Sequence, residues 1–80
     1  MKNNSKKTDI HIGNIIKQYI DDNKIYKSSL ARKLEVNDAV ILSYQKRSNL
    51  TTNTIMRLSH ALKHNFFADI GALLPAEFSK

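Results

Sequence analysis

Two histidines have the spacing of a metal-binding pair. His60 and His64 stand four residues apart, which would place both imidazoles on one face of a helix. A zinc site needs further ligands, yet the chain has no cysteine and no carboxylate at a suitable spacing from this pair. We therefore interpret both histidines as surface or half-buried side chains, and we expect no metal site.

Residues that could perform catalysis are scattered along the chain. The carboxylates do not stand beside a nucleophile and a histidine, and no glycine-rich phosphate loop occurs. Tyr44 could act as a nucleophile in DNA strand transfer, but it follows Ile41 by three residues, in an apolar register that assigns it to a core. The sequence therefore predicts a protein that is not an enzyme and needs no cofactor.

The charged residues favour a polyanionic partner. Thirteen Lys and Arg residues against seven Asp and Glu residues give a net charge of +6. We expect residues 1–8 to form a disordered basic arm, in which Lys6 and Lys7 serve solubility or reach a DNA minor groove. A second basic group surrounds the middle of the chain and consists of Lys24, Lys27, Arg32, Lys33, Lys46 and Arg47.

Apolar residues at helical spacing predict an all-α domain over residues 9–75, followed by an unassigned tail at 76–80. No internal repeat and no strand-like alternation competes with this interpretation. Thr51 or Thr52 can cap the fourth helix, and Pro75 should stop the fifth. The five expected helices cover about residues 12–23, 27–34, 38–46, 52–63 and 66–74.

The second and third of these helices are separated by a three-residue turn. Leu30, Ala31 and Leu34 form an apolar strip on the second helix. Val36 can fill the corner, and Asn37 is a good N-cap for the third helix. This is the plan of a helix-turn-helix, a motif whose DNA-binding version places the second of its helices in the major groove.

With these elements in place, the chain resembles the phage repressor and Cro-like, or XRE-type, helix-turn-helix family. The resemblance covers about residues 12–67, and it implies a lambda-repressor-like DNA-binding domain of about five short helices. The matching positions are Leu30-Ala31, Leu34-x-Val36, Ile41 and Ile55-x-x-Leu58-x-x-Ala61-Leu62.

The resemblance also implies a DNA-contacting surface. The residues that it assigns to base edges are Asn37, Asp38, Ala39 and Ser43. Those that it assigns to phosphates are Lys27, Lys46, Arg47, Asn49, Thr51 and Asn53.

The chain departs from the family pattern in the turn and in the third helix. Glu35 stands where the family favours glycine, so we expect a strained or altered backbone there. Asp38 can only accept a hydrogen bond from cytosine N4, and Ala39 offers only a methyl contact to thymine. Leu42 falls where the family tends to be polar.

The function expected from these residues is sequence-specific DNA binding by a transcriptional regulator. We expect a homodimer that binds two half-sites of DNA. One or both of the two phenylalanines expected at the dimer contact could instead seal the core. The residues expected at the dimer contact are Phe66, Phe67, Ile70 and Leu74.

An alternative function keeps the same fold. The chain could be a protein-interaction adaptor or an antitoxin-like accessory protein with weak or non-specific DNA binding. Val40 and Leu42 would then contact a protein partner through the third helix. The apolar runs are short and nothing resembles a signal peptide or a membrane span, so we expect a cytoplasmic location.

Overall fold

The computed structural model describes residues 10–75, in which all regular structure is helical. The expected basic arm at 1–8 and the tail at 76–80 lie outside the described residues. The all-α prediction is confirmed for residues 10–75. The helices are α2 (Ile12–Asp22), α3 (Lys27–Leu34), α4 (Asp38–Lys46), α5 (Thr52–Leu62) and α6 (Phe66–Gly71).

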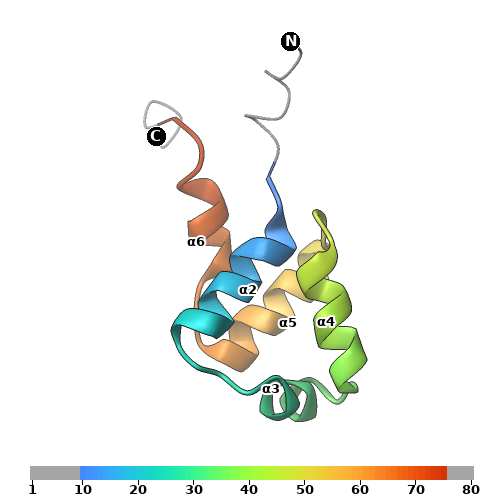
Figure 1. The fold of residues 1–80 in the computed structure, drawn as a ribbon. Coiled ribbons are helices and arrows are strands. Elements are labelled where there is room, and N and C mark those ends of the chain that lie inside the picture. Colours follow the sequence, from blue (N-terminus) through green and yellow to red (C-terminus); the bar gives the residue numbers. More distant parts are fainter. Residues whose placement is uncertain (1–9, 76–80) are drawn as a thin grey trace.

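The helices form a closed ring of contacts around one core (Figure 1). Helix α2 packs on α4, α4 on α3, α3 on α5, α5 on α6, and α6 packs back on α2. The apolar strips predicted for the first four helices face this core. The buried apolar side chains are Ile16, Ile20, Leu30, Ala31, Leu34, Ile41, Ile55, Leu58 and Phe66.

The bounds of α3 and α4 agree with the sequence-based expectation, whereas α6 is shorter than expected. It ends at Gly71, and tight-turn hydrogen bonds follow from Leu73 N to Ile70 O (3.1 Å) and from Leu74 N to Gly71 O (3.1 Å). Leu73 and Leu74 are 59% and 57% exposed. A further helical turn would therefore bury little apolar surface, which explains why the helix does not continue to Pro75.

Side-chain caps explain where several helices begin. Asn37 Oδ1 accepts from Val40 N at the start of α4, and Thr51 Oγ1 accepts from Thr54 N at the start of α5. Asn65 does the same for α6. The expected caps Asn37 and Thr51 are confirmed.

Three helices end with a left-handed residue that is not glycine. Lys24, Glu35 and Lys63 have φ angles of 53°, 60° and 53° after α2, α3 and α5. After α3, Glu35 N donates to Arg32 O and Val36 N donates to Ala31 O, which is the Schellman arrangement. The sequence predicts a strained or altered backbone at Glu35, and the residue adopts the left-handed conformation, which a Cβ makes costly by roughly 1 kcal/mol.

The first turn of α2 is held directly against the end of α4. Ile12 N donates to Ser48 O and Gly13 N donates to Arg47 O, each at 2.9 Å. A Cβ on Gly13 would lie 2.5 Å from Arg47 O and 2.7 Å from Gln45 O, and it would also strike Tyr44 O. Glycine is therefore needed for this close approach, which fixes α4 relative to the rest of the domain.

Candidate nucleic-acid interface

Helix α4 has one face in the core and one face in solvent. Ile41 and Gln45 are buried, while Val40, Ser43 and Tyr44 are half-buried. We define the α4 surface as the exposed residues of this helix and its C-cap, namely Asp38, Ala39, Leu42, Lys46 and Arg47. The structure therefore brings two of the expected base-reading residues, Asp38 and Ala39, onto one exposed face with two of the expected phosphate-binding residues.

The remaining expected base-reading residues are less free. Asn37 is exposed, but its Oδ1 accepts from Val40 N at 3.3 Å and is thereby directed at the helix end. Ser43 is only partly exposed. Gln45, which is not one of the expected base-reading residues, is 6% exposed, and its Nε2 has no hydrogen-bond partner among the described residues. That amide points into the protein rather than toward a ligand in solvent.

The expected phosphate-binding residues fall into two separate places. Lys46, Arg47 and Asn49 are exposed at the end of α4 and in the following loop, beside the first turn of α2. Thr51 and Asn53 follow at the start of α5, where Thr51 Oγ1 is already engaged as a cap. The first place therefore combines the cationic side chains of Lys46 and Arg47 with the N-terminus of α5.

Lys27 marks the second place, near the opposite end of α2. A hydrogen bond from Lys17 Nζ, 2.7 Å from Asp21 Oδ2, lowers the pKa of Asp21, and the charge of Lys27 adds to this effect. Asp21 lies in the last turn of α2, whereas Arg47 contacts the first turn. The two places therefore lie near opposite ends of α2, a helix of 11 residues.

Two other cations stabilise helix ends within the domain. Arg57 Nη2 on α5 donates to Leu34 O at the end of α3 (2.8 Å), and Lys33 Nζ on α3 donates to Ala61 O at the end of α5 (3.4 Å). Each helix thus supplies a positive charge to the other's C-terminal carbonyls. Lys33, grouped by sequence with the basic residues around the turn, therefore contacts α5, and sequence analysis did not single out Arg57 at all.

The expected dimer residues differ in exposure. Phe66 is fully buried, so it is a core residue and is not available for a dimer contact. The alternative role considered for it, sealing the core, is confirmed. Phe67 and Ile70 are half-buried, and Leu74 is 57% exposed. Of the expected set, only the last three could reach a second copy.

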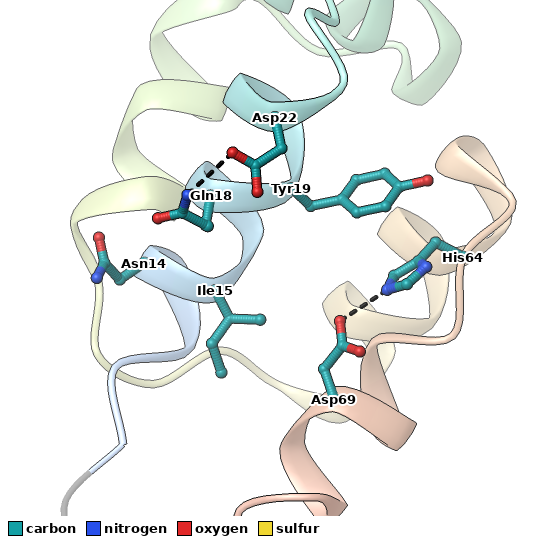
Figure 2. A pocket seen from close by; sticks show the side chains of 7 residues that line it. All are labelled: Asn14, Ile15, Gln18, Tyr19, Asp22, His64 and Asp69. Carbon is teal, nitrogen blue, oxygen red and sulfur yellow. Dashed lines mark hydrogen bonds and ion pairs between the residues drawn. The ribbon is translucent and has the colours of Figure 1, made fainter.

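A groove between α2 and α6 gathers a different set of polar residues (Figure 2). It has a volume of about 440 Å³. The residues that line this α2–α6 groove are Asn14, Ile15, Gln18, Tyr19, Asp22, His64 and Asp69.

Most polar groups of the α2–α6 groove are already paired. Gln18 Nε2 donates to Asp22 Oδ1 at 3.0 Å, and His64 Nε2 lies 2.7 Å from Asp69 Oδ2. The rings of Tyr19 and His64 stack with their centroids 4.2 Å apart. The stack joins α2 to the segment before α6, whereas the two hydrogen bonds are local to each side of the groove. None of the lining residues is a serine, threonine or cysteine nucleophile. The groove is therefore interpreted as a structural contact between α2 and the segment around α6, and not as a binding site.

The histidine pair singled out by its spacing does not share a helix, because α5 ends at Leu62. His64 Nε2 lies 2.7 Å from Asp69 Oδ2 in the α2–α6 groove, while His60 is exposed on α5. Both histidines also line one open hollow beside the junction of α5 and α6. Among residues 10–75, no group of three or more His, Cys, Asp and Glu residues could hold a metal ion.

Comparisons with protein-family models, curated proteins and solved structures find no match to this chain. None of the helices within residues 10–75 has the length and apolar character needed to span a membrane.

Proposed function

We propose that the chain binds double-stranded DNA as a helix-turn-helix protein and acts as a sequence-specific transcriptional regulator. In this proposal α3 and α4 are the two helices of the motif in a lambda-repressor-like domain, and α4 enters the major groove. The observation that carries the proposal is the α4 surface, an exposed helix face with cationic groups at its end. Within residues 10–75, no ion pair is formed by Lys27, Lys46 or Arg47.

The placement of the cationic residues supports this docking. Lys46 and Arg47 lie at the end of α4, and Lys27 begins α3, the other helix of the motif. In this proposal all three bind phosphates that flank the major groove.

The connection between α3 and α4 also supports the proposal. Only three residues, Glu35 to Asn37, separate the helices. The Schellman bonds at Glu35 end α3 abruptly, the side-chain cap of Asn37 starts α4 at once, and Val36 packs against the core. These local bonds define the path of the turn even though glycine is absent from it.

One observation favours a second candidate function, that of a protein-interaction adaptor. Leu42 lies in the middle of the α4 surface and is 44% exposed. Val40 beside it is half-buried, so an apolar partner could bury both side chains. Antitoxin-like accessory roles belong to this same class.

Selection on a random pool of duplex DNA at near-physiological salt tests the proposal. We expect an enriched motif, and we expect two half-sites in it if the protein binds as a dimer. Protein that retains no duplex, or retains it without any sequence enrichment, would contradict sequence-specific regulation and favour the adaptor.

Charge removal tests the docking mode. Arg47→Gln should weaken binding and reduce the slope of log affinity against log salt by about 1, because one phosphate contact is lost. Lys63→Gln is the matched control, since it removes the same charge at the junction of α5 and α6. Equal effects of the two variants would contradict the proposed orientation.

A further inference from the structure

The exposed face of α4 is apolar in the middle of the helix, where the proposed docking places the base edges of DNA. We call this part of the face, Ala39 and Leu42, the α4 stripe. Ala39 and Leu42 are exposed and three residues apart, so they lie on the same face of the helix. Lys46 continues this face four residues later, at the end of the helix. Between Asp38 and Lys46, the exposed side chains of α4 are thus the aliphatic ones of Ala39 and Leu42, and neither can form a hydrogen bond.

The side chains that could have formed two hydrogen bonds to a purine are directed elsewhere. Two bonds to adenine require the oxygen and the nitrogen of an amide together. Asn37 Oδ1 accepts from Val40 N, and Gln45 is buried with its Nε2 inside the protein. Neither amide is presented to solvent as a free pair of donor and acceptor.

We propose that α4 selects its DNA site chiefly through the C5-methyl groups of thymine, which Ala39 and Leu42 contact. This inference rests on the proposed function. Thymine is the only base that presents a methyl group in the major groove, so an aliphatic stripe can distinguish it without any hydrogen bond. Contact removes apolar surface of both the methyl group and the side chain from water.

Asp38 adds a separate preference at the neighbouring position. Its exposed carboxylate stands one residue before Ala39, in the first turn of α4. A carboxylate only accepts hydrogen bonds, so it favours a base with an amino donor, cytosine N4 or adenine N6, and it disfavours guanine, which presents only the acceptors N7 and O6. The first turn therefore favours cytosine or adenine at its own position, while the α4 stripe favours thymine.

Replacement of thymine by deoxyuridine in the selected duplex tests the inference. Deoxyuridine keeps every hydrogen-bonding group of thymine and lacks only the methyl group. We expect each substitution at a contacted thymine to weaken binding about fourfold, which corresponds to one buried methyl group. The same substitution outside the enriched motif is the control and should have no effect.

The variant Leu42→Ala connects the effect to its side chain. It should bind the thymine duplex more weakly, and one deoxyuridine substitution should no longer weaken its binding further. Leu42 is 44% exposed, so the variant should fold, which its thermal unfolding curve checks.

The outcomes separate the inference from the function on which it rests. Enrichment of a motif whose thymines tolerate deoxyuridine would overturn the methyl readout while leaving DNA regulation in place. Sensitivity to deoxyuridine that persists at every contacted thymine in Leu42→Ala would overturn the role of this side chain. Absence of any enriched motif would overturn the proposed function itself.

Discussion

The α4 surface and the α2–α6 groove are both open to solvent, but they differ in how their polar groups are paired. In the groove, Gln18 bonds to Asp22 and His64 bonds to Asp69, with the ring of Tyr19 stacked on the imidazole. On the α4 surface, Lys46 and Arg47 form no ion pair with any residue in the range 10–75.

This difference separates structural polar groups from available ones. A groove whose donors and acceptors already face each other must break those bonds to accept a polar ligand. Exposed cations without an internal partner can neutralise phosphates at no such cost. A cluster of titratable residues is therefore weaker evidence of a binding site here than a helix face with unpaired charges.

The largest effect should come from Phe66, whose ring meets Tyr19 and His64 edge-on behind the groove. Phe66→Ala should destabilise the domain by about 3–5 kcal/mol, because the side chain is fully buried. This is comparable to the stability that the whole hydrophobic core supplies in many domains of this size. Phe67→Ala, at a half-buried position, is the control and should cost clearly less in urea unfolding. Equal costs would place Phe66 outside the core.

Gly13→Ala tests how α4 is held in place. The new Cβ would strike backbone oxygens at the end of α4, so the first turn of α2 must move and its bond to Arg47 O must lengthen. We expect a loss of about 3 kcal/mol. Gly71→Ala is the matched control, because nothing lies within 4 Å of its Cβ position and alanine favours helix. A Gly13→Ala protein as stable as the parent would show that α4 is not held by this contact.

His64→Ala sharpens the contrast between the two regions. Loss of the bond to Asp69 and of the stack on Tyr19 should lower the free energy of unfolding by about 1–2 kcal/mol. Affinity for DNA should stay unchanged in protein that remains folded. His60→Ala, at an exposed position, serves as control and should change stability by less than about 0.5 kcal/mol. A His64 variant with full stability but impaired DNA binding would reverse the assignment of the two regions.

The smallest expected effect is a gain. Glu35→Gly should stabilise the domain by about 0.5–1 kcal/mol, because glycine adopts φ 60° without the steric cost of a Cβ. Arg32→Gly, inside α3, is the control and should lose about 1 kcal/mol. Thermal unfolding monitored by circular dichroism measures both. A loss of stability in Glu35→Gly would indicate that the glutamate side chain stabilises the turn.

Local signals explain which parts of the fold could be predicted from sequence. The bounds of α3 and α4 follow from apolar spacing and from the cap at Asn37, all within a few residues of each other. The end of α6 could not be read in this way, because Leu73 and Leu74 continue the apolar pattern but find no surface to bury them. Periodicity predicts what a helix could bury, whereas the tertiary structure decides whether a partner surface exists.

Contacts between distant residues account for the other differences. The bonds from Arg57 to Leu34 O and from Lys33 to Ala61 O join residues more than twenty positions apart. No spacing rule distinguishes such cations from those left free for a ligand. Phe66 and Phe67 present the same problem, since neighbouring identical residues become core and half-exposed only when α6 docks.

Backbone amide shifts during titration with the selected DNA duplex test the central claim most directly. We predict that the largest shift changes map to the α4 surface and to the start of α5. The amide shifts of residues that line the α2–α6 groove, such as Gln18 and Asp69, should not change. Changes centred on the α2–α6 groove, with the α4 surface unperturbed, would contradict the account.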